Sequence, residues 1–219
     1  MVNYRNDPDA AGTVVVACQA AGVRAIAVRA DVAVERDVQQ MFDRTVGAPS
    51  SATVVVNNAG IVHVQARLDT YPYGRLREVF DVNVIGTFLC AREAVLRMST
   101  RHGGQGGSIV NVSSAAAYLG SPDEYIDYAA SKGAIDTLTI GLAKEVGAEG
   151  IRVNAVRPGL IDTEIHASSG EPGRAARLAA TVPMRRVGTA DEVAATIMWL
   201  ASDEATYVNG AIVNCSGGP

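Results

Sequence analysis

Short, continuous runs of apolar and β-branched residues recur along this chain. They lie at residues 25–28, 53–56, 108–112, 151–156 and 211–213. A strand exposed on one face would alternate apolar and polar residues, whereas continuous runs are typical of strands covered on both faces. The pattern therefore predicts a sheet buried between two layers.

Longer segments with helical spacing of apolar residues lie between these runs. The predicted helices cover residues 8–21, 34–46, 75–98, 125–146 and 190–201. Strands that alternate with helices are joined by right-handed crossovers into a parallel sheet. We predict an α/β fold of the doubly wound, Rossmann-like kind. A chain of 219 residues is long enough for one sizeable core, so we expect a single domain over residues 1–219.

Composition and charge narrow the class of protein. Hydrophobic residues make up 48% and charged residues 19% of the chain, and no apolar run approaches the roughly 20 residues that span a bilayer. A formal net charge of −4 without a basic run gives no footprint for a nucleic-acid backbone. We expect a soluble protein that binds neither a membrane nor a nucleic acid.

The start of the chain and the cysteines bear on its compartment. The first seven residues have no basic flank followed by an apolar stretch, so they do not resemble a signal peptide, and we expect a cytoplasmic location. Cys18, Cys90 and Cys215 occur singly, without the spacing of a metal site or a disulfide framework. We therefore expect unpaired thiols and no metal.

Tyr128 and Lys132 lie four residues apart in the predicted helix 125–146, so their side chains share one face. A positive charge beside a phenol favours the phenolate, which brings the pKa of the phenol from about 10 toward the range useful for general acid–base catalysis. An ordinary pair on a helix surface has the same spacing, so the spacing alone does not decide between the two.

Ser113 and Ser114 directly follow the predicted strand 108–112. In open α/β sheets, ligands bind beyond the carboxyl ends of the strands, where a serine can hold a substrate oxygen. A serine in this position is more often a turn residue or a helix cap. The presence of Tyr128 in the same chain favours the catalytic interpretation.

Two asparagine motifs also call for an explanation. Asn57-Asn58-Ala59-Gly60 follows the predicted strand 53–56, where amides and a glycine can approach a ligand closely, although an ordinary Asn-Gly turn fits as well. Asn83 is a poor helix former among aliphatic residues of the predicted helix 75–98. A kink or a bound water there would explain it.

Taken together and in this order, the motifs resemble those of the short-chain dehydrogenase/reductase family, and the likeness covers essentially all 219 residues. The catalytic residues that the resemblance implies are Ser114, Tyr128, Lys132 and Asn83. Tyr125 does not match the family's tyrosine, because the residue four positions later is an alanine.

The resemblance implies a mechanism for these residues. Tyr128 would pass a proton to the substrate oxygen as hydride arrives at the carbon, while Lys132 would lower the pKa of the phenol and hold the nicotinamide ribose. Ser114 would polarise the carbonyl. Asn83 would position a water that joins the lysine to bulk solvent.

The resemblance also implies a nicotinamide dinucleotide as cofactor. An Asp-Val pair would border the adenine, the asparagine motif would stabilise the sheet beside the cofactor, and the segment 157–163 would contact the carboxamide. The implied cofactor-binding residues are Arg5, Asp31, Val32, Asn58, Ala59, Gly60, Tyr128, Lys132, Pro158, Gly159, Ile161 and Thr163.

The start of the chain resembles the end of the family's second strand, and the residue that follows it favours NADP over NAD. An acidic residue there would bind the ribose hydroxyls of NAD, whereas arginine accommodates a 2′-phosphate. The sequence reads Val2-Asn3-Tyr4-Arg5 and has no acid until Asp7. Arg5 as a solvated loop cation is the alternative, and NAD remains open.

The chain departs from the family pattern at its beginning. The family opens with a strand, a Gly-x-x-x-Gly-x-Gly turn and a helix, whose backbone amides approach the pyrophosphate. Here the first glycine, Gly12, falls inside a predicted helix, so about 30 residues of the pattern are missing, including a central strand. We expect a start codon assigned too late; a true truncation, rearranged or completed by a partner, is the alternative.

The substrate is left open by the sequence. Residues 160–188 carry two prolines and three glycines and are typical of a substrate lid, whose arginines either attract an anion or are solvated.

We expect an oxidoreductase that transfers hydride between NADP(H) and a carbonyl or secondary alcohol; a ketone, a keto-sugar and a 3-oxoacyl thioester would each fit. A non-catalytic relative, inactive without the phosphate-binding loop, is the alternative. The resemblance further implies a homodimer or homotetramer.

Overall fold

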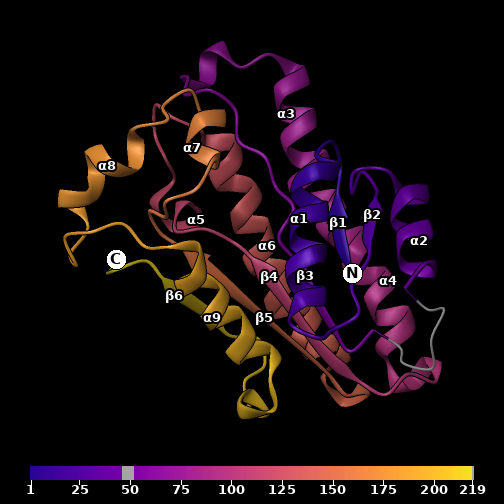
Figure 1. Ribbon diagram of the computed structural model, residues 1–219. Helices are drawn as coiled ribbons and strands as arrows, with labels where there is room; N and C mark the ends of the chain where they lie inside the picture. The colour runs from indigo at the N-terminus through magenta and orange to yellow at the C-terminus, as the bar shows by residue number, and fades with distance from the viewer. Residues whose placement is uncertain (46–51, 219) are drawn as a thin grey trace.

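Every strand in the described part of the chain runs parallel to its neighbour. The computed structural model describes residues 1–45 and 52–218. Its strands are β1 (Val2–Tyr4), β2 (Ala27–Arg29), β3 (Val54–Asn57), β4 (Gly107–Val112), β5 (Ile151–Pro158) and β6 (Ile212–Cys215). They form a four-stranded sheet in the order β3-β4-β5-β6 and a two-stranded sheet β1-β2 (Figure 1). The predicted Rossmann-like α/β fold is confirmed.

Helices connect the strands and cover both faces of the four-stranded sheet. The longer ones are α1 (Pro8–Ala20), α2 (Glu35–Asp43), α3 (Tyr73–Phe80), α4 (Gly86–Met98), α6 (Ile126–Val146) and α9 (Ala190–Ala201). The short ones are η1 (Leu68–Thr70), η2 (Asp81–Ile85), η3 (Thr100–His102), α5 (Ala116–Leu119), η4 (Gly147–Glu149), α7 (Ile165–Ser168), α8 (Arg174–Leu178), η5 (Ala179–Thr181) and η6 (Asp203–Ala205). Four of the predicted helices recur with closely similar limits; residue 46, the predicted end of one, lies outside the described residues.

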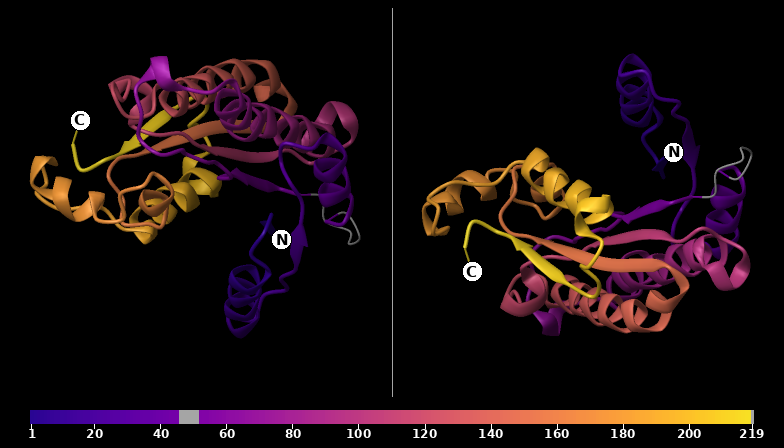
Figure 2. Two further views of the ribbon diagram at one scale, coloured as in Figure 1. Left: turned by 90° about the horizontal axis from the view of Figure 1, so that it is seen from above. Right: turned by 90° about the horizontal axis from the view of Figure 1, so that it is seen from below.

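Neighbouring residues of the central strand β4 face opposite layers. Ile109 is buried in a cluster with Met98 of α4 and Val146 of α6. Val110 is buried in a second cluster with Leu200 of α9. Side chains alternate along a strand, so the continuous apolar run supplies both faces at once. Figure 2 shows the result, with α4 and α6 on one side of the sheet and α9 on the other.

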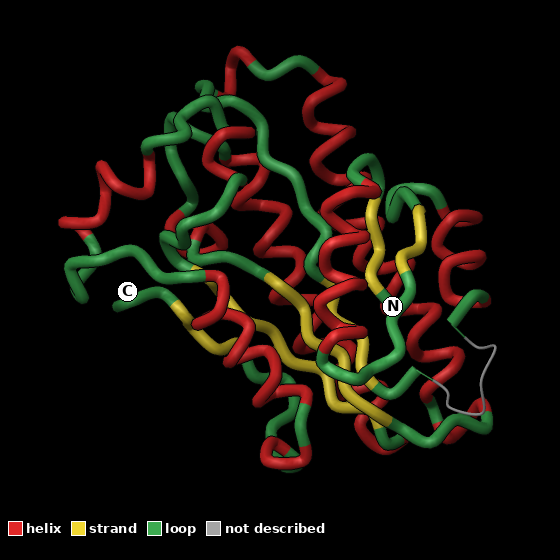
Figure 3. The backbone as a smooth tube through the Cα atoms, in the orientation of Figure 1, coloured by secondary structure: helices red, strands yellow, loops and turns green. Residues whose placement is uncertain are grey.

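The sheet is divided between β1 and β3, as Figure 3 shows. Val54 and Val56 of β3 are 45% and 43% exposed, which is high for apolar strand residues of a covered sheet. A cavity of about 520 Å³ lies against the β3 edge and also reaches Asn3 of β1. α1 packs on β1 and β2 and stands apart from the larger sheet (Figure 2). The doubly wound arrangement thus contains two strand edges that face each other without pairing.

The segment predicted as one helix over 75–98 consists of α3 and α4 joined by the π-helical turn η2. Asn83 lies in this turn and is buried, and the Thr87 hydroxyl donates to its backbone carbonyl at 2.8 Å. The irregularity expected at Asn83 is therefore a π turn. A single π turn inside a longer helix is short and rare, so the apolar spacing of the whole segment still predicts one helix.

The predicted lid, residues 160–188, lies over the carboxyl ends of the strands and contains α7 and α8 (Figure 1). Its two ends are fastened together by a bridge between Ile161 and Gly188. The Gly188 amide donates to the Leu160 carbonyl, and the Asp162 amide donates to the Gly188 carbonyl, both at 2.9 Å. The segment between these points is therefore a closed loop with a fixed base.

Candidate active site

Two cavities meet at the carboxyl edge of the four-stranded sheet. One, of about 820 Å³, is lined by the ends of β3, β4 and β5 and by the first part of the lid. The other, of about 530 Å³, lies under α8 of the lid. Ser114, Tyr128 and Gly159 line both of them. Volumes of this size suit small organic ligands.

Ser114 occupies the position expected directly after β4 and makes the turn contact that one of the two interpretations predicts. Its hydroxyl accepts a hydrogen bond from the Ala116 amide at 3.1 Å, so it terminates the strand and starts the turn into α5. The same hydroxyl faces the Tyr128 phenol, close enough to lower the pKa of the phenol by hydrogen bonding. A residue that caps a turn is held in one rotamer, which fixes the hydroxyl relative to the phenol.

Lys132 is almost fully buried one helical turn after Tyr128. Its Nζ donates to the Val112 carbonyl at 2.7 Å and lies 5.6 Å from the centroid of the Tyr128 ring. Burial lowers the pKa of the ammonium to about 8, and the charge of Asp136 raises it. The lysine is thus tied to the end of β4 rather than to solvent.

Burial raises the pKa of the Tyr128 phenol, and the hydrogen bond with Ser114 lowers it. The net direction is upward, opposite to the lowering that the sequence analysis expected from Lys132. The reason is that desolvation of a phenolate outweighs the hydrogen bond in this half-buried position. The phenol is therefore the stable form of Tyr128 at neutral pH.

Asn83 is bonded to the loop after β3 rather than to the lysine. Its Oδ1 accepts from the Ile61 amide at 2.8 Å, and its Nδ2 donates to the Ile61 carbonyl at 2.9 Å and to the Ser131 hydroxyl at 3.0 Å. A Cβ on Gly60 would lie 3.4 Å from both the Asn83 Oδ1 and the Lys132 Nζ. The glycine therefore lets the β3 loop pass close to both side chains.

A buried ion pair, with no signal in the sequence, holds the start of α6. Arg75 of α3 contacts both carboxylate oxygens of Asp127, at 2.7 and 3.1 Å. Its guanidinium also donates to the Val64 carbonyl at 2.7 Å and stacks 3.8 Å from the centroid of the Tyr71 ring. Asp127 Oδ1 accepts from the Tyr128 amide at 2.9 Å. The pair thus fixes the backbone of the residue on which the site depends.

A second ion pair lies one turn beyond Lys132. Arg157, which lies near the end of β5, binds Asp136 Oδ2 at 2.7 and 3.0 Å and stacks 5.4 Å from the centroid of the Tyr118 ring. Asp136 is 7% exposed. The arginine side chain therefore connects β5 to α6, on the far side of the lysine from Tyr128.

The predicted cofactor-binding residues do not all line one cavity. The 820 Å³ cavity takes Asn58, Gly60, Tyr128, Lys132, Pro158, Gly159, Ile161 and Thr163. Val32 and Ala59 line the cavity between the sheets, and Arg5 and Asp31 line a further one of about 520 Å³. Arg5 lies 3.9 Å from Asp31, and Asp31 also accepts from the Ala33 amide at 3.0 Å.

The 820 Å³ cavity fits one end of an extended ligand. Gly159 lines this cavity and packs on the Ser216 backbone, where an added Cβ would lie 2.7 Å away, so no larger residue fits there without a shift. Ile161 gives an apolar wall, and Thr163 and Asn58 give polar groups at the rim. This mixture of flat apolar surface and amide-binding groups suits a nicotinamide ring and its ribose.

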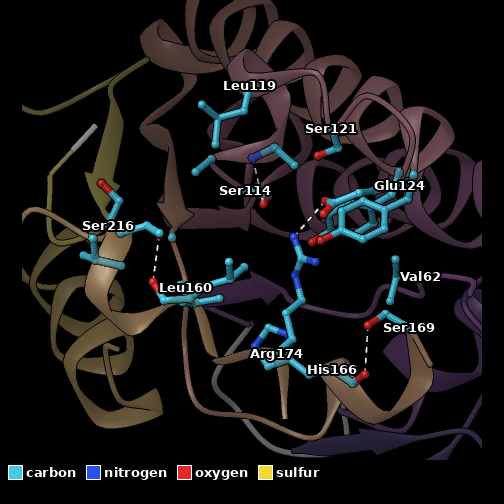
Figure 4. A pocket seen from close by; sticks show the side chains of 18 of the residues that line it. Val62, Ser114, Leu119, Ser121, Glu124, Leu160, His166, Ser169, Arg174 and Ser216 are labelled. Atoms are coloured by element: carbon cyan, nitrogen blue, oxygen red, sulfur yellow. Dashed lines mark hydrogen bonds and ion pairs between the residues drawn. The ribbon is translucent and has the colours of Figure 1, made fainter. Parts of the chain in front are cut away.

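The far end of the 530 Å³ cavity is polar. Figure 4 shows Arg174 of α8 reaching across this cavity to Glu124, with which it pairs at 2.7 Å. The expectation that the lid arginines are solvated surface charges is wrong for Arg174, which is buried and paired with Glu124. Arg177 and Arg186 are exposed, and each is paired with a glutamate of this chain.

Membrane, thiol and metal features complete the description. No helix within residues 1–45 and 52–218 has the length and apolar character of a membrane span. Cys18, Cys90 and Cys215 are free thiols, and burial raises the pKa of Cys90 to about 12. In the same described ranges, no three His, Cys, Asp or Glu side chains gather as metal ligands would.

Comparison with known proteins identifies the family of the chain. A family model described as enoyl-(acyl carrier protein) reductase matches residues 1–219. The chain is 51% identical to an uncharacterised oxidoreductase of Escherichia coli, YgfF, over 99% of this chain and 88% of the relative. It is 38% identical to 3beta-hydroxysteroid dehydrogenase 1 of Eggerthella lenta, over 100% of this chain and 82% of the relative.

A solved structure gives the same result at the level of the fold. A gluconate 5-dehydrogenase from Burkholderia cenocepacia, in complex with NADP and tartrate, matches with a TM-score of 0.87 and 30% sequence identity, over 99% of this chain and 83% of that chain. Fold and relatives define a nicotinamide-dependent oxidoreductase that acts on CH–OH or C=O groups. The chain belongs to the short-chain dehydrogenase/reductase family.

Proposed function

We propose that this protein transfers hydride between NADP(H) and a secondary alcohol or its ketone, with Tyr128 as the general acid and base. The observation that carries the proposal is that Ser114 and Tyr128 both line the two cavities at the place where the cavities meet. A carbonyl carbon held there would face the cofactor cavity on one side. Its substituents would lie in the cavity under the lid.

The chain's own groups account for the movement of the proton. In ketone reduction the Tyr128 phenol donates its proton to the substrate oxygen, and in alcohol oxidation the phenolate takes it back. Ser114 donates to the same oxygen and orients it. Lys132, a buried cation 5.6 Å from the phenol ring, stabilises the phenolate that remains. The nicotinamide, when bound, supplies or accepts the hydride.

Asn83 has a positioning role in this proposal. Its side-chain amide binds both backbone groups of Ile61, so it fixes the loop that borders Lys132. Lys132 donates one proton to the Val112 carbonyl, which leaves two N–H groups for the ribose and for a water that returns protons from solvent. The relay through Asn83 expected from the resemblance remains part of the proposal.

The preference for NADP rests on charge in the cavity at the end of β1. Arg5, Arg29 and Arg44 line it together with Asp31 and Asp37, which leaves an excess of one positive charge. Arg5 is less than half exposed and is held only loosely by Asp31, at 3.9 Å. An arginine with free N–H groups binds a 2′-phosphate well.

Fluorescence titration with NADPH and NADH tests this preference. Arg5→Ser is expected to weaken NADPH binding by about 10-fold and to leave NADH binding unchanged, because only NADPH carries the phosphate. The matched control is Arg24→Ser, since Arg24 is exposed and lines none of the four cavities described for this chain. An equal loss for both nucleotides would contradict the assignment of Arg5.

Turnover of ketones and secondary alcohols by the whole chain tests the enzymatic proposal. Tyr128→Phe is expected to lower kcat by about 10²- to 10⁴-fold without loss of NADPH binding. Tyr207→Phe is the control, because Tyr207 is fully exposed. Nucleotide binding without turnover by the wild-type chain would instead support the non-catalytic relative.

We also propose a cytoplasmic homo-oligomer. The free thiols support a reducing compartment. Ile85, Phe88 and Leu96 are 48%, 48% and 47% exposed, and they give the outer side of η2 and α4 an apolar surface. Light scattering measures the molar mass of the protein in solution, and a monomer at all concentrations would contradict the homo-oligomer. Cell fractionation tests the cytoplasmic location.

A further inference from the structure

The polar end of the cavity under the lid is built from two arginine–glutamate contacts. Arg174 of α8 binds Glu124 Oε2 at 2.7 Å and Glu171 Oε2 at 3.5 Å, and its guanidinium lies 5.5 Å from the centroid of the Tyr125 ring. It is only 8% exposed. Figure 4 shows its side chain crossing the cavity from the lid to the loop that precedes α6. Arg174 is therefore part of the cavity wall and not a surface cation.

The charges of this wall cancel. Glu171 is also bound by Arg177, whose Nη2 donates to Glu171 Oε2 at 3.0 Å, and by the Gln65 amide at 3.1 Å. Two arginines thus face two carboxylates, Glu124 and Glu171. An anionic ligand would meet the Glu124 carboxylate or would have to break its pair with Arg174. Either event leaves a charge uncompensated in a poorly solvated position, which is costly.

Glu124 is held in place and is still accessible from the cavity. Its backbone carbonyl accepts from the Ala66 amide at 2.9 Å and from the Tyr71 phenol at 3.4 Å, so its position does not depend on a ligand. Its side chain is 30% exposed. A carboxylate has about four acceptor sites and a guanidinium has five N–H groups, so the pair retains both acceptors and donors for a ligand.

We propose that the substrate is a neutral polyhydroxylated alcohol or ketone, of the polyol or keto-sugar class, whose distal hydroxyls bind the Arg174–Glu124 pair. A hydroxyl both donates and accepts, so one hydroxyl can donate to Glu124 and accept from Arg174 without a net charge. The proposal rests on the proposed function, since the reacting carbon must lie at Ser114 and Tyr128. Leu119, Leu160 and Leu178 line the rest of the cavity and pack against the carbon skeleton.

Three substrates of equal chain length test the class: D-sorbitol, D-gluconate and 2-hexanol. They are, respectively, a neutral polyol, an anionic polyol and an alcohol without distal hydroxyls. We expect kcat/KM for sorbitol to exceed that of each other compound by at least about 10-fold, since a site built to bind hydroxyls discriminates against ligands that leave its charges unpaired. A kcat/KM for gluconate or 2-hexanol equal to or above that for sorbitol overturns the proposal.

Glu124→Gln locates the effect within the cavity. It keeps the shape of the side chain and removes its charge, so we expect it to lower kcat/KM for sorbitol by about 10-fold, to raise that for gluconate, and to leave that for 2-hexanol unchanged. Glu145→Gln is the matched control, because Glu145 is exposed on α6 away from the cavity. An equal effect of Glu124→Gln on all three substrates shows a structural role and overturns the assignment.

The two proposals fail in different ways. If the wild-type chain turns over 2-hexanol, loses this turnover in Tyr128→Phe and shows no preference for sorbitol, the proposed function is supported and the proposed substrate class is contradicted. Saturation-transfer NMR measures binding of sorbitol and gluconate without turnover, so a chain that turns over neither compound still tests the class. Sorbitol binding that Glu124→Gln weakens supports the class, and gluconate binding at least as tight as that of sorbitol overturns it.

Discussion

At the residue scale, Ser114 and Tyr128 form the contact on which the proposed chemistry depends. The hydrogen bond from Ser114 lowers the pKa of the phenol against the effect of burial. Ser114→Ala removes it, so the pKa of Tyr128 rises. Because alcohol oxidation needs the phenolate, the rising limb of the kcat profile is expected to move to higher pH, and kcat at neutral pH to fall about 100-fold.

The comparison for this prediction is Ser113→Ala. The Ser113 hydroxyl donates to the Lys132 carbonyl at 3.2 Å and not to the phenol, so the limb of the profile stays in place. A profile unchanged in both variants means that Ser114 does not control the ionisation of Tyr128.

The Lys132 ammonium makes stability depend on pH. Its pKa in the folded chain is about 8, below the ordinary 10.5, because of burial. The unfolded chain therefore binds this proton more tightly, and the free energy of unfolding rises between about pH 8 and pH 10.5, by up to about 3 kcal/mol. Lys132→Met is expected to lose this rise. Urea denaturation at several pH values measures the rise in the free energy of unfolding. Lys144 is an exposed lysine of the same helix, so the control variant Lys144→Met is expected to retain the rise.

At the element scale, the attachment of α3 to the start of α6 depends on Arg75 and Asp127. Asp127→Ala leaves a buried guanidinium without its carboxylate, so we expect a loss of about 3–5 kcal/mol in the free energy of unfolding. Arg75→Met/Asp127→Leu, which removes both charges, is expected to recover most of this loss. A double variant no more stable than Asp127→Ala would show that packing, and not charge, is the cause.

The elements themselves follow closely from the sequence, and their junctions do not. Continuous apolar runs locate β2 to β6, and helical spacing locates α1, α6 and α9. The π turn at Asn83 is not visible in the periodicity because it spans only five residues between two helices, too few to show a period of their own. The Arg75–Asp127 pair is equally invisible, since its partners are 52 positions apart in sequence and each is an ordinary polar residue of a helix.

At the scale of the whole molecule, the candidate site was predictable where motifs lie at the ends of adjacent strands. Parallel strands end on the same side of the sheet. One edge therefore brings together Ser114 after β4, Gly159 after β5 and Tyr128 on α6. Glu124 and Arg174 were not predictable as partners, because a lid and a loop 50 residues apart meet only through the fold. The distribution of the predicted cofactor-binding residues over three cavities was likewise not visible in the sequence.

The division of the sheet makes the molecule unequally stable. β4 is paired on both edges and its residues 108–111 are buried, whereas β1 is paired only with β2 and is half-buried. Backbone amides open with a free energy that falls as burial and pairing decrease. We therefore expect the amides of β1 to exchange hydrogen at least about 100-fold faster than those of β4, as measured by mass spectrometry after pepsin cleavage, with α1 exchanging alongside β1. Equal protection of β1 and β4 would mean that the two sheets unfold as one cooperative unit, and that the cavity between their edges does not weaken the coupling between them.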